Sequence, residues 1–299
     1  MAREGHGLND LAGHGTRDLR PGNVRQMDAQ RPARAGVLLR QWRQRRRLSQ
    51  LDLALLADTS ARHLSCLETG RARPSRTMVL RLSAALDVPL RDRNTMLLAA
   101  DYAPEYRESS LDDDTMTSIR AALDTMLAAH EPFPAVVVDR CWNVLAGNRA
   151  MAILMNGIPP NLLEPQPNVF RLALHPDGLA GRLANLGQVR ALFLERLLRQ
   201  VNATGDADLR SLYEEVCRYP VPAGEITDGD DNLGHPPSPI QVPLRIRTPQ
   251  GELSMFSTMA TFGAPADVTL SELAIELFYP LDDFTRDALR AFAVCRPVT

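Results

Sequence analysis

The stretch of residues 48–74 constrains this chain most, because it encodes two short helices, a tight turn between them and a basic loop. Ser49 can cap the first helix, and Asp52 three positions later completes a capping box. The second helix carries Leu64 and Leu67 three apart on its inner side, which leaves its polar residues on the outer side. A helix held in this way has the shape and orientation that fit the major groove of DNA.

Charge is divided unevenly along the chain. Residues 34–93 contain thirteen arginines against five acidic residues, whereas residues 94–299 contain sixteen arginines against twenty-seven acidic residues. The basic part contains the two short helices, and the acidic part would be repelled by phosphate. This division predicts one DNA-binding face rather than a generally adhesive protein.

The residues around the two helices resemble the XRE-type helix-turn-helix of phage repressors and bacterial regulators. The resemblance covers about residues 36–88 and is carried by LSQ at 48–50, LA at 53–54, LS at 64–65, LETGR at 67–71, PS at 74–75 and LDV at 86–88. It implies an all-α, five-helix, lambda-repressor-like DNA-binding domain over residues 34–103, with outer helices over residues 35–47 and 90–100. The family's turn usually carries glycine where this chain has Asp58. Aspartate tolerates a positive φ better than most residues, so we expect the turn to form.

The resemblance places the DNA contacts on the second short helix, expected over residues 60–69, and around it. Arg62 is the main candidate for reading a base, because a guanidinium group pairs with O6 and N7 of guanine. The three arginines of the following loop are expected to clamp phosphates, which sets affinity more than sequence choice. The expected DNA contacts are Gln50, Ser60, Ala61, Arg62, Ser65, Cys66, Arg71, Arg73 and Arg76.

Arg43 and Glu68 are expected to have a structural role. In the repressors that this segment resembles, an arginine near the end of the first helix pairs with the glutamate that follows the recognition-helix leucine. Here those residues are Arg43 and Glu68, so we expect an ion pair between them. Such domains read two half-sites as a homodimer, which implies double-stranded DNA with a pseudo-palindromic sequence.

The rest of the chain predicts a second domain of α+β class over residues 113–299, after a polar and acidic linker over residues 104–112. Helical periodicity marks residues 113–130, 148–155, 169–198 (with a break at 175–178) and 206–218. Apolar runs predict strands over residues 135–139, 142–146, 240–248, 252–261 and 272–279. Residues 219–239 predict a long loop, and the composition of residues 1–33 predicts a disordered N-terminal tail. A hairpin, then helices, then a β-meander is an α+β order.

This second part resembles the PAS-like ligand-binding domain of the MmyB-like regulators. The strings that carry the resemblance are EPFPAVVVDRCWNVLAGN, LALHPDGLA, PLRIRTPQGELSMFST and DVTLSELAIELFYP, with LRDRNTMLLAADYAP as the connector between the domains. Together the two resemblances cover about residues 36–285. They imply a multidomain transcriptional regulator whose C-terminal domain senses a small, apolar or fatty-acid-like ligand.

PAS-like folds hold their ligands between the sheet and the helices packed on it. The candidate ligand contacts are therefore residues expected to line this space. The apolar candidates are Trp142, Phe193, Leu197 and Phe256, with Val138, Val144, Leu174, Leu194 and Met255 as further wall positions. Each of them also fits a plain hydrophobic core. The polar candidates for orienting a carboxylate or another head group are Asn148, Arg171, His175 and Arg190. Pro176 follows His175 directly, so this histidine is also suited to ending its helix.

Other functions of the second domain find less support in the sequence. As an alternative, this domain is a dimerisation or partner-binding module without a small ligand. A haem or flavin sensor would use contacts such as His175 or Cys141. The sequence has no nucleophile elbow, HExxH motif or glycine-rich phosphate loop, so we expect no enzymatic activity. The four cysteines form no CxxC pair, so we expect neither a metal site nor a disulfide framework.

The ends and the apolar runs of the chain bear on its location. The N-terminus lacks the apolar core of a signal peptide, and the longest apolar runs are too short to span a bilayer. We therefore expect a cytoplasmic, nucleoid-associated protein without a membrane partner. No cofactor is expected other than a bound fatty acid or a similar apolar small molecule.

Overall fold

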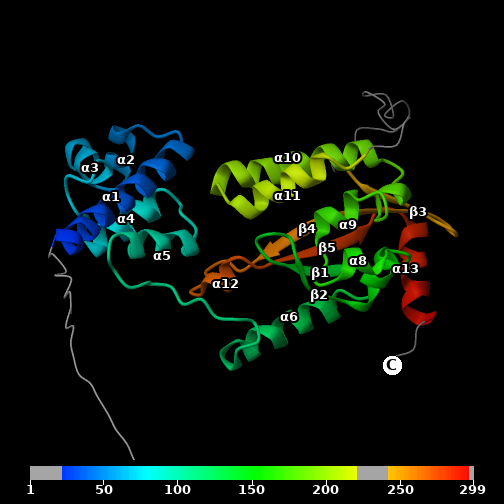
Figure 1. Cartoon of the computed structure of the whole chain (residues 1–299). Coiled ribbons are helices and arrows are strands. Elements are labelled where there is room, and N and C mark those ends of the chain that lie inside the picture. The colour runs from blue at the N-terminus through cyan, green and yellow to red at the C-terminus, as the bar shows by residue number, and fades with distance from the viewer. Residues whose placement is uncertain (1–21, 221–241, 296–299) are drawn as a thin grey trace, which may run out of the picture.

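The computed structural model describes residues 22–220 and 242–295, which form two domains (Figure 1). The first domain contains only helices, namely α1 (Gly22–Arg45), α2 (Gln50–Leu56), α3 (Ala61–Glu68), α4 (Arg76–Ala85) and α5 (Leu90–Ala99). The second domain combines helices with a five-stranded sheet. An all-α domain followed by an α+β domain is the expected order, and it is confirmed.

Short polar side chains set the starts of α2, α3 and α4. Ser49 accepts a hydrogen bond from the backbone of Asp52, and the Asp52 carboxylate accepts one from the backbone of Ser49, so the expected capping box is present. The side chains of Ser60 and Ser75 cap α3 and α4 by accepting hydrogen bonds from the backbone of His63 and Met78. The turn after α2 forms with Asp58 at φ 47°, as expected without a glycine at this position.

The five helices enclose one apolar core and approach each other closely. Leu53 of α2, Leu64 of α3 and Leu97 of α5 are each 0% exposed. Gly36 lies where α1 crosses α3, and a Cβ atom there would meet the carbonyl oxygen of Leu67 at 2.3 Å. The absence of a side chain at Gly36 therefore allows the two helix backbones to touch, which fixes α3 against the core.

The first helix begins earlier than the sequence analysis predicted. Residues 1–33 were expected to be a disordered tail, but α1 starts at Gly22 and so includes residues 22–33; residues 1–21 lie outside the described part. Met27, Ala29 and Gln30 have helix propensities that favour this extension. Adding turns to a helix that is already formed is also easier than starting one. The Gly- and Asp-rich composition of the whole segment concealed this local preference.

The sheet joins two hairpins that are far apart in the sequence. Its strands are β1 (Ala135–Val138), β2 (Val144–Gly147), β3 (Leu244–Thr248), β4 (Gly251–Thr261) and β5 (Ala274–Pro280). All neighbours are antiparallel, in the order β2-β1-β5-β4-β3. The last strand thus lies between the two hairpins, and its Leu277 pairs with Ala135.

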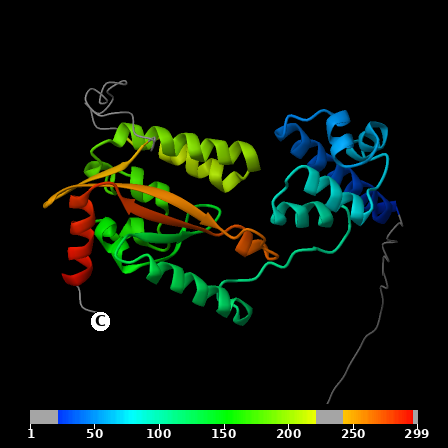
Figure 2. The same ribbon diagram turned by 180° about the vertical axis from the view of Figure 1, so that it is seen from behind.

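Helices cover both faces of this sheet (Figures 1 and 2). The longer ones are α6 (Thr117–Ala129) on one face, α9 (Val169–Leu174), α10 (Leu186–Thr204) and α11 (Ala207–Cys217) on the other, and α13 (Asp283–Cys295) at one end. The short ones are η1 (Asp114–Met116), η2 (Arg149–Met151), α7 (Ala152–Met155), α8 (Pro160–Leu163), η3 (Ala180–Arg182) and α12 (Val268–Ser271). Strand alternation separates two cores: Val136 and Val138 pack toward α10, whereas Ala135 and Val137 pack toward α6.

Three parts of the second domain differ from the prediction or fall outside the described residues. The expected helical region over residues 169–198 is interrupted where the sequence predicted a break, but the break is longer than residues 175–178, because α9 ends at Leu174 and α10 begins only at Leu186. Helix α13 was not predicted. The loop expected over residues 219–239 lies almost wholly outside the described part of the chain. Among the helices that the structure describes, none combines the length and the hydropathy that crossing a membrane requires.

The segment expected as a linker, residues 104–112, is bound to both domains. The side chain of Asn94 in α5 donates to the carbonyl of Tyr106 at 2.7 Å and accepts from its backbone N–H at 3.0 Å. One residue later, the carbonyl of Arg107 accepts from the N–H of Val268 at the start of α12, at 2.8 Å. This segment therefore holds α5 beside α12 rather than separating the domains.

Ion pairs and a hydrogen bond form further contacts between the domains. Arg91 of α5 donates to both carboxylate oxygens of Glu272, at 2.8 and 2.9 Å, and to Glu108 at 2.7 Å. Arg46, at the end of α1, donates to the carbonyl of Ala203 at the end of α10, at 3.3 Å. Gly205, which follows α10 at φ 69°, lies beside the guanidinium group of Arg45. The end of α10 thus contacts the end of α1.

Candidate functional site

Helix α3 presents its polar side to solvent because its apolar side is fixed in the core. Leu64 and Leu67 are 0% and 1% exposed. The remaining surface carries expected DNA-contacting side chains: exposed Ser60 and Arg62, and half-buried Ala61, Ser65 and Cys66. Arg62 and Cys66 are four residues apart and so lie on the same side of the helix. Both views show α3 on the side of the first domain that faces away from the second domain (Figures 1 and 2).

Glu68, at the end of α3, connects three parts of the first domain. Nε and Nη2 of Arg43 donate to its two carboxylate oxygens at 2.6 and 2.9 Å, and Nε2 of Gln50 donates to it at 2.8 Å. The side chain of Glu68 is only 2% exposed. Burial alone would raise the pKa of Glu68, but the hydrogen bonds from Arg43 and Gln50 outweigh burial and lower it. Gln50, expected as a DNA contact, therefore has an amide group that is engaged within the protein.

The loop arginines differ in the partners that they have. Arg73 donates to the carbonyl of Ala100 at 3.0 Å and lies over the ring of Tyr102. Arg76 forms an ion pair with Glu105. Arg62 and Arg71 are exposed, and within the described part of the chain neither side chain forms a hydrogen bond or an ion pair. These two guanidinium groups are therefore the ones most available to a nucleic acid.

The four polar candidates of the second domain are placed in different surroundings. Asn148 donates to the carbonyls of Phe133 and Leu127 and accepts from the N–H of Ala135, so it holds the start of β1. Arg190 donates to the carbonyls at the end of α11. Both side chains are occupied by backbone groups, which explains their polarity without a ligand.

Arg171 and His175 do lie together, at a polar hollow of about 370 Å³ on the outer side of α9 and α11. Arg171 donates to both oxygens of Glu215, at 2.8 and 2.7 Å, and Tyr219 donates to the same carboxylate at 2.6 Å. The ring of His175 packs edge-on against Tyr219. His175 also ends α9, as its position before Pro176 suggested. The hollow is not the space between sheet and helices.

The apolar candidates fall on two faces of the sheet. Trp142, Phe193 and Leu197 belong to the core between the sheet and α10, where the rings of Trp142, Phe170 and Phe193 pack edge-on in a row. Met255 faces the same core. Phe256, its neighbour on β4, stacks on Tyr279 instead, and Tyr279 contacts His130 at the end of α6. The prediction that Phe256 shares the wall with Trp142 was therefore wrong, because neighbouring residues of a strand point to opposite faces.

The sequence analysis missed a charged pair in this core. Glu276, on β5, is 3% exposed and accepts a hydrogen bond from Ser257 of β4 at 2.7 Å. Nη1 of Arg196, on α10, lies 4.0 Å from the same carboxylate, and its guanidinium group stacks on Trp142 at 4.1 Å from the ring centre. Burial raises the pKa of Glu276 and lowers that of Arg196. An acidic residue inside the apolar strand AIELFYP was the signal that marks this position.

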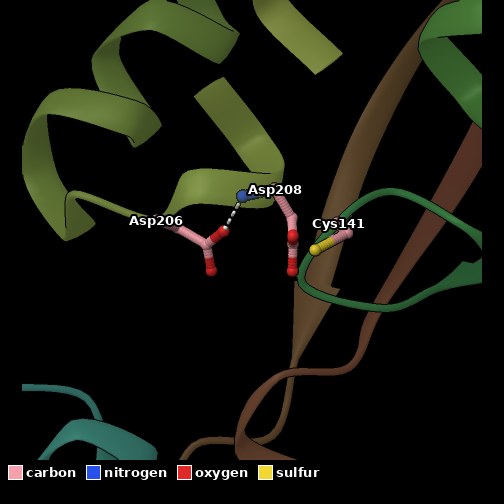
Figure 3. Close-up of side chains that lie close together, drawn as sticks. All are labelled: Cys141, Asp206 and Asp208. Carbon is pink, nitrogen blue, oxygen red and sulfur yellow. Dashed lines mark hydrogen bonds between the residues drawn. The ribbon is translucent and has the colours of Figure 1, made fainter. Parts of the chain in front are cut away.

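A second cluster brings together Cys141, Asp206 and Asp208 (Figure 3). Their potential ligand atoms lie within 4.8 Å of one another. The carboxylates already have partners: Asp206 accepts from the backbone at the start of α11, and both aspartates pair with Arg140. Burial also raises the pKa of the Cys141 thiol, which keeps it protonated. The ion pairs with Arg140 near the domain boundary therefore account for the proximity of these residues.

Comparisons with known proteins agree with this division of the chain. The sequence pattern of a helix-turn-helix domain matches residues 34–96, and that of the MmyB-like transcription regulator ligand binding domain matches residues 119–292. No curated protein matches the chain. A solved structure described as an RNA-binding light-oxygen-voltage receptor is 14% identical, with a TM-score of 0.23, and the match covers 95% of this chain and 70% of that one. A similarity this low supports no conclusion about fold or function. The family match covers more than half of the residues, so the chain belongs to the family of transcription regulators with an MmyB-like ligand binding domain.

Proposed function

We propose that this regulator reads a specific DNA sequence through α3 and that its second domain senses a small apolar or fatty-acid-like molecule. The observation that carries the first part is the exposure of Arg62 on a helix whose other side is locked in the core. Arg62 reads a base, and Ser65 and Cys66 lie close enough on the same helix to contact neighbouring bases. Arg71 is the main phosphate contact, because Arg73 and Arg76 must first leave their protein partners. Two copies of the chain bind two half-sites.

The experiment that tests DNA reading selects bound fragments from a random DNA pool and then compares variants on the selected sequence. Arg62→Ala is expected to relax preference at one base pair, at a cost of about 1–3 kcal/mol. Arg71→Ala is expected to leave base preference unchanged and to lower the slope of log affinity against log salt by roughly one. Binding that shows no dependence on salt would overturn the proposal. Arg62→Ala with unaltered preference would remove α3 from the reading role.

The ligand part of the proposal places the apolar molecule against the row of rings formed by Trp142, Phe170 and Phe193. These rings lie between the sheet and α10, and Phe193 remains half-buried at the edge of the core. A family defined by a ligand binding domain supports a small-molecule ligand in this half of the chain. Mass spectrometry of small molecules extracted from the purified protein tests it.

A second candidate function follows from the packing of this same core. Leu197 and Met255 are both 0% exposed and belong to one hydrophobic core, so the sheet and α10 are packed together. A filled core favours a domain that dimerises or binds a partner without any small ligand. Two results would support this alternative: an extract without a stoichiometric small molecule, and a melting temperature that no fatty acid raises.

A further inference from the structure

The second half of β4 is an open edge of the sheet. The pairing of β3 with β4 ends at Met255, whereas β5 continues to pair with β4 as far as Thr261. Residues 257–261 are all exposed, and no isolated bridge joins them to another part of the described chain. Figure 2 shows this half of β4 along the front of the sheet, beyond the end of β3.

The hydrogen bonds of β5 show which backbone groups lie along this edge. The N–H of Phe278 donates to the carbonyl of Pro134, on the side of β1, so the backbone groups of its neighbours on β5 point toward β4. Those neighbours pair with even-numbered residues of β4. The odd-numbered residues therefore direct their N–H and C=O groups away from β5, and beyond the reach of β3 these residues are Ser257, Met259 and Thr261.

This edge lacks the features that protect a strand in solvent. Connecting segments hydrogen-bond to the outer edges of β2 and β3, where Val144 donates to Pro167 and Ala184 donates to Arg245, each at 2.8 Å. Proteins protect an edge that stays uncovered with charged residues, proline or a bulge. Residues 253–266 contain no charged residue, β4 contains no proline, and its pairing with β5 runs without a shift of register. Such an edge is expected to pair with another strand.

The chemistry of the edge favours a second copy of the same chain as that strand. Two identical antiparallel strands are related by a two-fold axis, and an axis at Met259 would pair Ser257 with Thr261 of the second copy. The three outward residues would then form about six hydrogen bonds. The side chain of Met259 is 36% exposed and would meet its counterpart at the axis. The second domain is acidic and repels its own kind elsewhere, but residues 253–266 carry no charge that opposes this approach.

We propose that two copies of this chain associate by antiparallel pairing of the second half of β4 with that of the other copy. The two five-stranded sheets then become one continuous sheet. A two-fold axis closes the assembly at two copies, because each copy uses the same edge. This inference goes beyond the proposed function, since it concerns the protein without DNA and a surface other than α3.

Sedimentation equilibrium of the full chain without DNA measures the association, and the wild type is expected to have the mass of two chains. Met259→Pro removes an N–H at the axis and leaves the hydrogen bonds to β5 in place, so association is expected to weaken about ten-fold. Met259→Lys brings two like charges together at the axis and is expected to weaken it to a similar extent. Met126→Lys is the matched control, because Met126 is also an exposed methionine but lies on α6. It is expected to associate as the wild type does.

Cysteine cross-linking tests the register. In the proposed pair the two Cα atoms at position 259 would be about 5.5 Å apart, which a disulfide can span. The two Cα atoms at position 261 would be about 14 Å apart, which is too far. With oxygen as the oxidant, Met259→Cys is therefore expected to form a covalent dimer. Thr261→Cys is expected to form no more than the wild type does.

A wild type with the mass of one chain would overturn the inference, and so would unchanged association of Met259→Lys. Equal cross-linking at positions 259 and 261 would also overturn it, because the two copies would then meet in another way. If circular dichroism shows that Met259→Pro does not fold, Met259→Lys and the cross-linking decide. A monomeric wild type in which Arg62→Ala still relaxes base preference would leave DNA reading by α3 in place, so the two proposals fail separately.

Discussion

At the scale of single residues, Glu68 shows how the first domain keeps α3 in place. Its carboxylate receives Arg43 from α1 and Gln50 from α2 while belonging to α3. Three helices thus share one buried acceptor. A carboxylate in this position stabilises the domain only while its donors remain, since an unpaired buried charge is strongly unfavourable. The same contacts fix the orientation of α3 within the domain.

Arg43→Ala is expected to lower both the stability of the protein and its affinity for DNA. Its side chain is 12% exposed and that of Glu68 is 2% exposed, so the loss corresponds to a buried pair, about 3 kcal/mol. Thermal unfolding and gel-shift titration of the same samples measure the two effects. Arg40→Ala, an exposed change on the same helix, is the control and is expected to alter the melting temperature little. A large loss of affinity at an unchanged melting temperature would show that Arg43 touches DNA instead.

At the scale of elements, α13 secures the outer hairpin of the sheet, although nothing in the sequence analysis assigned it. Thr285, which is 0% exposed, accepts a hydrogen bond from the N–H of Ser254 in β4 at 2.9 Å. The next turn of α13 adds Leu289 to the core under α10. The carbonyl of Ser254 accepts from the N–H of Leu281, which lies between β5 and α13. Both backbone groups of Ser254 therefore have hydrogen-bond partners.

Thr285→Val keeps the shape of this side chain and removes its acceptor. The N–H of Ser254 would then be buried without a partner, so we expect unfolding to become easier by about 1–3 kcal/mol. Urea unfolding followed by circular dichroism measures the change. Thr258→Val is the matched control, because Thr258 is exposed on the same strand. Equal stability of Thr285→Val and wild-type would mean that water replaces the lost acceptor.

The elements also show which features the sequence could predict. Caps, turns and strand alternation act locally, so Ser49 marked a helix start and the apolar runs marked all five strands. The order of the strands depends on pairing between residues more than a hundred positions apart, such as Val136 with Glu276, and no local pattern encodes it. The pair of Arg196 and Glu276 depends on that order, which is why the sequence analysis chose Arg171 and Arg190 instead.

At the scale of the whole molecule, the second domain contacts the first through charged groups near the core between the sheet and α10. The side chain of Gln200 on α10 accepts from Nε1 of Trp142 at 2.7 Å and donates to the carbonyl of Arg140 at 3.0 Å. Arg140 pairs with Asp206 and lies 4.0 Å from Glu272, the partner of Arg91 in α5. A shift of Trp142 would therefore reach the domain boundary through hydrogen-bonded neighbours. For such a path to regulate DNA binding, the ligand must favour one arrangement of the domains over another.

Arg91→Gln is expected to loosen the contact between the domains. Arg91 is 34% exposed, so the loss of its pair with Glu272 is discounted for solvent to about 1 kcal/mol, or about five-fold in the population of the open state. Trypsin cleavage after Arg107 reports this opening, because the carbonyl of Arg107 is hydrogen-bonded to Val268 only while the domains are closed. Cleavage at that bond, followed by mass spectrometry, should therefore be about five-fold faster in the variant.

The control and the double variant decide whether the effect belongs to this pair. Arg286→Gln breaks an exposed pair with Asp283 in α13, away from the domain boundary, and should leave cleavage after Arg107 unchanged. Glu272→Gln alone should accelerate cleavage, and adding it to Arg91→Gln should increase the rate by less than the product of the two single effects, because both changes remove one interaction. Fully multiplicative rates would show that Arg91 holds the domains through Glu108 rather than through Glu272, and the path from Trp142 would then end at Arg140.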